Sequence, residues 1–140
     1  MAEEIMAPVN VAQELSAEAT STFCSVQGGD RKTKALIYNA MNNPKHKVGD
    51  FINKTIDVKD VFVELIEQTS EETGEIVQVP RVVLIDDKGE AYQAVSIGIF
   101  NAVKNAIQVF GQPTWDEPLK CMIKQITVKN GSMLTFEVQA

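Results

Sequence analysis

The sequence is poor in the residues on which metal sites and disulfide frameworks depend. Its 140 residues include two cysteines, Cys24 and Cys121, and one histidine, His46. The cysteines lie far apart and outside any metal-binding spacing, so we expect no metal site. In an intracellular protein both thiols are expected to be reduced and half buried, although a disulfide between them stays open.

Catalytic motifs are missing as well. The sequence holds no phosphate-cradling glycine motif, because Gly28-Gly29 lacks the partners of such a loop. His46 has no serine or cysteine motif to act with, and Asp86-Asp87 is explained by a tight turn. We therefore expect no catalytic residues, no cofactor and no enzymatic activity.

Long apolar runs are absent too. No stretch approaches the roughly 20 apolar residues of a membrane-spanning helix. The start, Met1-Ala2-Glu3-Glu4, lacks the basic and apolar parts of a secretion signal. Hydrophobic residues make up 44% and charged residues 23% of the chain, as in soluble globular proteins and unlike disordered ones. We therefore expect a cytoplasmic protein that makes no membrane contact.

The charge is unevenly distributed along the chain. The net charge is −6, yet residues 31–54 are predominantly basic and carry a single acid, Asp50. Acidic segments at 1–30 and 55–80 flank this basic block. A solvated, lysine-rich connection explains the block, and a phosphate-binding surface is the alternative. Its cations are Arg31, Lys32, Lys34, Lys45, Lys47 and Lys54.

The N-terminal part contains weaker structural signals than the rest. Residues 1–17 show little apolar periodicity, so we expect a mobile arm ahead of a single domain at 18–140. β-Branched and aromatic residues predict a short strand over Thr20–Gln27. Apolar residues at helical spacing then predict a helix over Arg31–Asn42, which ends before Pro44.

The region after Phe51 has the clearest pattern. Alternation in the first predicted strand changes phase near Lys59-Asp60, which indicates a bulge or a sharp bend. An apolar stripe predicts a helix over Ser96–Phe110, ended by Gly111. The remaining predicted strands, separated by polar or Gly-containing turns, are Glu75–Ile85, Ala91–Val95, Leu119–Val128 and Met133–Val138.

The predicted order of elements is strand, strand, strand, helix, strand, strand. This is the chain order of the oligonucleotide/oligosaccharide-binding (OB) fold, a small barrel of five strands. We therefore expect a mainly β protein, a five-stranded OB-fold barrel (β-β-β-α-β-β) with an N-terminal strand-helix extension. The fold favours the binding of single-stranded nucleic acid but does not establish it.

Single strands are held by cations that follow the phosphates and by rings on which bases stack. Phe62 and Tyr92 are out of phase with the apolar residues of their strands, so we expect them to point away from the core. Each ring alone is more often a packing residue. Four other rings, Phe23, Phe100, Phe110 and Phe136, are expected in the core. The predicted nucleic-acid-binding residues are Arg31, Lys32, Lys34, Tyr38, Lys45, Lys47, Phe51, Lys54, Phe62, Arg81, Lys88, Tyr92 and Trp115.

Three stretches, Val82–Tyr92, Ser96–Asn105 and Phe110–Trp115, resemble the small single-stranded-DNA-binding proteins of bacteriophages, notably the phi-29-type replication proteins. The resemblance implies an OB-fold protein that coats and protects displaced single strands during phage DNA replication, in the cytoplasm of a bacterial host. Single-stranded DNA is the implied partner, with replication proteins and self-association on DNA left open.

Another function class remains open from the sequence. An OB-fold adaptor could bind a protein through the acidic 55–80 hairpin and would lack affinity for oligonucleotides. A subunit of a larger assembly would bury Phe62 and Tyr92 in an interface with another chain.

Overall fold

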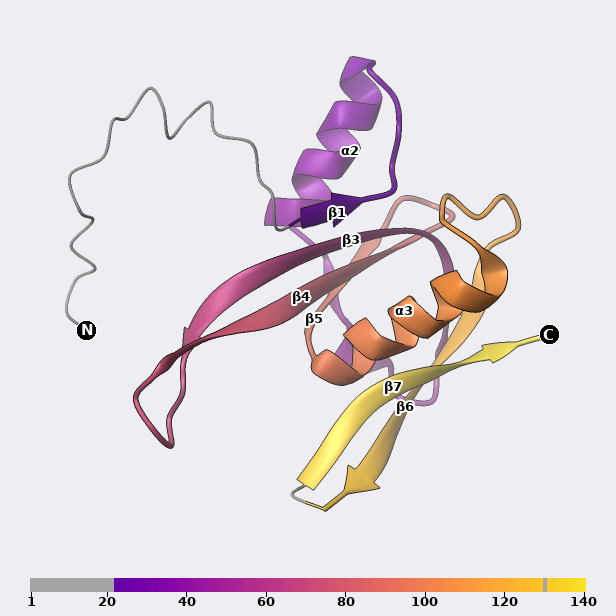
Figure 1. Cartoon of the computed structure of the whole chain (residues 1–140). Coiled ribbons are helices and arrows are strands. Elements are labelled where there is room, and N and C mark those ends of the chain that lie inside the picture. The colour runs from indigo at the N-terminus through magenta and orange to yellow at the C-terminus, as the bar shows by residue number, and fades with distance from the viewer. Residues whose placement is uncertain (1–21, 130) are drawn as a thin grey trace, which may run out of the picture.

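The computed structural model describes residues 22–129 and 131–140, so the predicted mobile arm at 1–17 lies outside the described residues. In this part of the chain a curled sheet is accompanied by two helices (Figure 1). Within it no helix has the length and apolar character needed to cross a membrane. The elements are β1 (Thr22–Cys24), α2 (Arg31–Asn42), β2 (His46–Lys47), the 3₁₀ turn η1 (Val48–Phe51), β3 (Thr55–Thr69), β4 (Ile76–Asp86), β5 (Ala91–Val95), α3 (Ile97–Phe110), β6 (Leu119–Val128) and β7 (Gly131–Gln139).

The predicted order of strands and helices is confirmed from β3 to β7. The strands form one sheet in the order β2-β5-β4-β3-β6-β7, and β1 pairs with β3. All pairs are antiparallel except β2 with β5, which is parallel. The sequence did not predict β2, because a strand of two residues is too short to show alternation.

The long strand β3 bends as its phase change predicted. It pairs with β6 through Thr55–Val58 and with β4 as far as Thr69, and the register shifts between Val58 and Asp60. One strand thereby joins two parts of the sheet and curls it. The β3–β4 and β6–β7 hairpins project from the body as two arms (Figure 1).

The sheet is open rather than closed in the described residues. No ladder joins β5 to β7, the pairing that would complete a five-stranded barrel of this order. Instead, α3 packs against β7, and a Cβ added at Gly98 would lie 2.0 Å from the carbonyl oxygen of Leu134. Only glycine permits this close backbone approach. The expected closed five-stranded barrel is therefore corrected to a curled, open sheet of seven strands, two of them short.

Both faces of β4 are buried from Val82 to Ile85, which determines where the core lies. Val82 and Leu84 belong to a cluster that includes residues of α3, whereas Val83 and Ile85 face the opposite way. Ala40 of α2 is buried in this second cluster, and Leu36 and Met41 pack against it. Full burial of a Val, Leu or Ile side chain, such as those of β4, contributes roughly 1.5–3 kcal/mol of hydrophobic free energy. The extension helix α2 therefore covers a face that a plain barrel would leave to solvent.

The expectation that Phe62 and Tyr92 point away from the core is wrong. Phe62 and Tyr92 do not point into solvent, since they are only 2% and 8% exposed. Phe62 lies on the face opposite Val61, as its phase indicates, but α2 covers that face. Tyr92 lies beside Leu84 in the first cluster, so the sequence assigned the wrong face to β5.

Candidate nucleic-acid interface

The exposed face of α2 collects three of the predicted residues. Arg31, Lys34 and Tyr38, spaced at three and four residues, line one shallow hollow. Tyr38 is 63% exposed, so its ring is accessible from solvent. A ring flanked by cations can stack on a base while the cations neutralise the adjoining phosphates. Lys32 is also exposed on α2 but does not line this hollow.

A second hollow lies at the C-terminal end of the same helix. Lys45, which follows α2, and Lys88, from the β4–β5 turn, line it together. Asn39 lines both this hollow and the first one, so the two adjoin along α2. Residues distant in the chain thus share one basic surface. We call this the α2 surface and define it as Arg31, Lys34, Tyr38, Lys45 and Lys88.

A group of rings follows the α2 surface along the chain, at β2 and η1. His46 stacks on Tyr92 with ring centroids 4.7 Å apart, and Phe51 meets both rings edge-on. Lys54 Nζ lies 5.6 Å from the centroid of the Phe51 ring. Sequence reasoning missed His46, which it treated as a solvated loop residue. The sequence signal that could have included His46 in the site was its position between Lys45 and Lys47, two predicted phosphate-binding residues.

Two carboxylates hold this ring group. His46 Nε2 lies 2.9 Å from Glu90 Oε1, and the Tyr92 hydroxyl donates to Asp86 Oδ2 at 2.9 Å. Burial, and next the hydrogen bond to Asp86, raise the pKa of Tyr92 well above its ordinary value, so the phenol stays neutral. Asp86 Oδ1 also accepts from the backbone N–H of Lys88 and of Glu90. Asp86 therefore shapes the turn that carries Lys88, as the turn interpretation predicted.

Lys47 occupies the open margin of the sheet. It pairs with Gln93 across the β2–β5 ladder. With Gln93, Val95 and Leu134 it lines a hollow of about 380 Å³ between β5 and β7. Lys47 is exposed there, beside the ring group that contains its neighbour His46.

Several predicted or excluded rings lie in unexpected places. Trp115 is 7% exposed, packs in the first core cluster, and donates from Nε1 to the carbonyl of Gly111 at 3.0 Å. With Phe62 and Tyr92, it is therefore not available to stack on a base. Conversely, Phe23 and Phe110, expected in the core, are 38% and 48% exposed. Phe110 is the last residue of α3, a position where the apolar stripe can leave the core.

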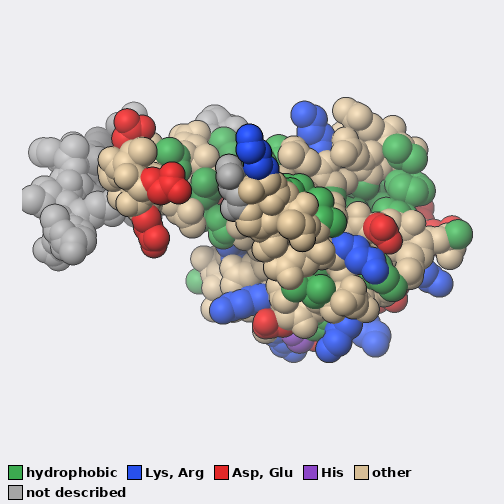
Figure 2. Space-filling model, turned by 90° about the horizontal axis from the view of Figure 1, so that it is seen from below, with side chains coloured by type: hydrophobic (Ala, Val, Ile, Leu, Met, Phe, Trp, Pro, Cys, Tyr) green, Lys and Arg blue, Asp and Glu red, His purple; other side chains and the backbone are tan. Residues whose placement is uncertain are grey.

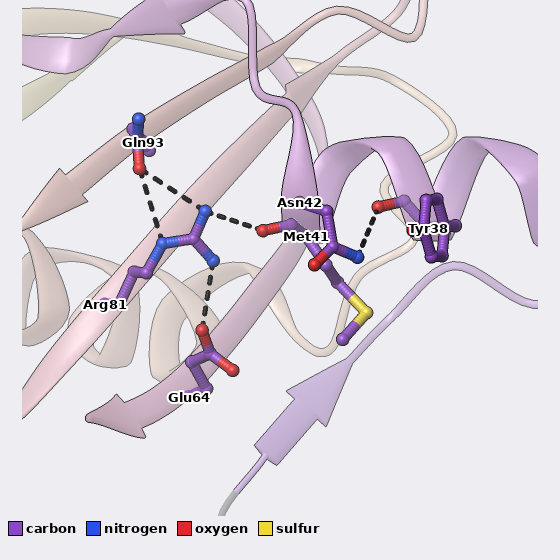
Figure 3. Close-up of polar contacts among 6 residues, drawn as sticks. All are labelled: Tyr38, Met41, Asn42, Glu64, Arg81 and Gln93. Carbon is purple, nitrogen blue, oxygen red and sulfur yellow. Dashed lines mark hydrogen bonds and ion pairs between the residues drawn. The ribbon is translucent and has the colours of Figure 1, made fainter. Parts of the chain in front are cut away.

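Arg81, predicted as a cation for phosphates, directs its guanidinium into the protein (Figure 3). Its Nη1 pairs with Glu64 Oε1 at 3.1 Å, and its Nη2 donates to the carbonyl of Met41 at 2.8 Å. Nε and Nη2 both donate to Gln93 Oε1, at 3.4 and 3.3 Å. The side chain is 11% exposed. It is not placed to contact a phosphate in this arrangement.

One group of acids lies on the β3–β4 arm, whereas Glu90 lines the second hollow with Lys45 and Lys88, and Asp87 is exposed next to Lys88. The β3–β4 arm carries exposed acids at Glu67, Glu71, Glu72 and Glu75. Figure 2 shows acidic side chains gathered on the projecting part at the left, with basic side chains spread over the body. The net negative charge is thus compatible with a basic surface at α2 and β2.

No metal or reactive-thiol chemistry is evident in the described part. Residues 22–129 and 131–140 contain no group of three His, Cys, Asp or Glu side chains able to hold a metal ion. Cys24 and Cys121 are free. Burial raises the pKa of Cys121 to about 12, so this thiol stays protonated near neutral pH.

One of three comparisons with known proteins identifies a family. A family model described as phage single-stranded DNA-binding protein, of the phi29 type, matches residues 16–139. The searches of curated proteins and of solved structures returned no significant match. The matched region extends from before β1 to the end of β7, so it includes α2 as well as the curled sheet. The chain therefore belongs to the phi29-type family of phage single-stranded DNA-binding proteins.

Proposed function

We propose that the protein binds single-stranded DNA without sequence preference and coats strands displaced during phage DNA replication, in the cytoplasm of the bacterial host. The observation that carries this proposal is the family match over residues 16–139. The curled sheet fits an OB-type barrel, of which we take β3, β4, β5, β6 and β7 as the five strands. In our assignment one domain spans 18–140, with β1 and α2 as its extension.

In this proposal the strand follows the α2 surface and continues past β2. Arg31 and Lys34 share a hollow with the exposed Tyr38 ring, and Lys45 and Lys88 line the adjoining hollow. Lys47 and Lys54 extend the basic path towards Phe51. Lys32, exposed on α2, adds to the positive field. Phosphate neutralisation releases counterions and is independent of sequence. Stacking is equally tolerant, because every base has a π-face.

Coating follows from the same contacts. A base stacked on a protein ring cannot pair with a complementary strand at the same time, so bound strands stay single. The acidic β3–β4 arm would disfavour the close approach of duplex DNA, whose charge density is higher. Release would occur when salt or a polymerase competes for the strand. Contacts with replication proteins and self-association on DNA are further parts of the proposal.

The test is anisotropy of a dye-labelled thymine oligonucleotide, titrated with the protein at two salt concentrations beside a matched duplex. We expect salt-sensitive binding of the single strand and little binding of the duplex. The anisotropy readout is preferable to protein fluorescence, because the only tryptophan, Trp115, is buried. Absence of binding to the single strand at low salt would refute the proposal.

A protein adaptor is the second candidate, favoured by one observation on the β3–β4 arm. Leu65, Ile76 and Val77 are 44%, 69% and 39% exposed, next to the acids of the arm. Such an apolar and acidic surface suits a protein partner. The adaptor candidate predicts no oligonucleotide affinity, so the same titration separates the two. An assembly interface built on Phe62 and Tyr92 is wrong, because both pack within the chain.

A further inference from the structure

Arg81 lies where four elements meet. It belongs to β4, and its partners are Glu64 on β3, Gln93 on β5 and the carbonyl of Met41 in the last turn of α2 (Figure 3). A guanidinium presents five N–H donors in a planar fork, which suits several acceptors at once. This side chain is therefore committed to contacts within the protein.

The contact with Met41 matters because of the end of α2. The last carbonyls of a helix have no intrahelical donor, and a cation there is favoured by the helix dipole. α2 has no basic residue in its own last turn. Arg81 supplies that missing charge from the sheet, at 2.8 Å from the carbonyl oxygen. It thereby ties the C-terminal end of α2 to β4.

The contact between Arg81 and Met41 lies between two groups of cations in the basic path. Arg31, Lys34 and Tyr38 precede it on α2, whereas Lys45 and Lys47 follow it. The second tie, from Arg81 to Gln93, reaches the residue that pairs with Lys47 in the β2–β5 ladder. One side chain thus links the end of α2 to the residue that pairs with β2, in addition to the packing of α2 on the second cluster.

We propose that Arg81 is a positioning residue for single-stranded DNA binding, which holds the α2 surface in register with β2 and does not itself contact phosphate. The inference rests on the proposed function. Loss of the tie would let the cations on α2 and those after it move independently. Ordering them would then oppose binding.

The test compares Arg81→Lys with Arg81→Gln in the thymine-oligonucleotide titration. A lysine keeps the charge but cannot span three acceptors. We expect both variants to bind about 2- to 30-fold more weakly, the range typical of coupling through packed contacts. The slope of log affinity against log salt should stay at the wild-type value in both. A phosphate ligand would behave differently, because Arg81→Lys would bind almost normally and Arg81→Gln would lose about 0.7 of the slope.

Glu64→Gln provides a second variant should Arg81→Gln fail to fold. It weakens one tie without removing any positive charge. We expect weaker binding at an unchanged slope, whereas an Arg81 that served phosphate would be freed from its competitor and would bind more tightly. Lys104→Gln, on the exposed face of α3, is the matched control for loss of a surface cation.

A double-mutant cycle separates positioning from plain stability. With Arg31 and Lys34 both changed to Ala, Arg81→Lys should have much less effect, since one half of the path is already lost. If folded Arg81 variants bind like the wild type, the inference is refuted while the proposed function stands. If the wild type itself does not bind the oligonucleotide, the proposed function is refuted and the inference falls with it.

Discussion

Truncation of Tyr38 is the sharpest test of the α2 surface. The ring is 63% exposed, so it contributes little to packing. Its backbone carbonyl accepts from Asn42 Nδ2 at 3.1 Å, a bond that does not involve the ring. Tyr38→Ala should therefore change the free energy of unfolding by no more than about 0.5 kcal/mol. Any large effect on DNA affinity then reports on binding.

The expected loss follows from base stacking. One stacked base contributes about 1–3 kcal/mol by alanine substitution, so Tyr38→Ala should weaken oligonucleotide binding by about 5- to 150-fold. Tyr38→Phe keeps the ring and should bind within about twofold of the wild type, since stacking needs no hydroxyl. The salt slope should not change in either variant, because no charge is lost.

The assay is the anisotropy titration, with urea unfolding of each variant to measure stability. Phe110→Ala is the matched control, because this ring is 48% exposed on α3, which packs on the opposite face of β4 from α2. Its affinity should equal that of the wild type. Normal affinity of Tyr38→Ala, or an equal loss in Phe110→Ala, would refute the assignment of the α2 surface.

Three further predictions concern charge, packing and pH. Lys45→Ala and Lys47→Ala should each lower the salt slope by about 0.7, and an unchanged slope would remove that residue from the phosphate path. Phe62→Ala should lower the free energy of unfolding in urea by about 3–5 kcal/mol, because the ring is 2% exposed beneath α2, and a loss below about 1 kcal/mol would contradict that burial. Burial raises the pKa of Cys121 to about 12 in the folded protein, against 9.0 for the free thiol. Above pH 9 the thiol therefore ionises in the unfolded chain and not in the folded one, so the free energy of unfolding should fall as the pH rises. The urea midpoint should fall less between pH 9 and 10 in Cys121→Ala, and equal falls would contradict the raised pKa.

The sequence determined the local elements well. The helix over Arg31–Asn42 was predicted with the observed bounds, and α3 begins one residue after the predicted Ser96, whose side chain caps it. The bend at Lys59-Asp60 was visible because alternation has a period of two, and a bulge reverses its phase. Such features depend on neighbours in the chain, so a single sequence contains them.

Sequence reasoning found the site only in part. The basic block and Tyr38 were visible as composition and helical spacing, and the structure places Arg31, Lys34 and Tyr38 around one hollow. The pairing of Lys45 with Lys88 across one hollow could not be foreseen, since it depends on where the β4–β5 turn meets the end of α2. Whether these residues bind DNA stays a prediction.

Only the tertiary structure decided which polar and aromatic side chains remain free. The phase of alternation predicted on which face of β3 Phe62 lies. It could not predict that α2 packs on that face and buries it in a second core cluster. The sequence predicted Arg81 to be a surface cation, whereas in the structure its guanidinium contacts Glu64, Gln93 and the end of α2. The physical reason is the same in each case. Burial and hydrogen bonding are set by elements that are distant in the chain, whereas periodicity reports only on the strand or helix that contains the residue.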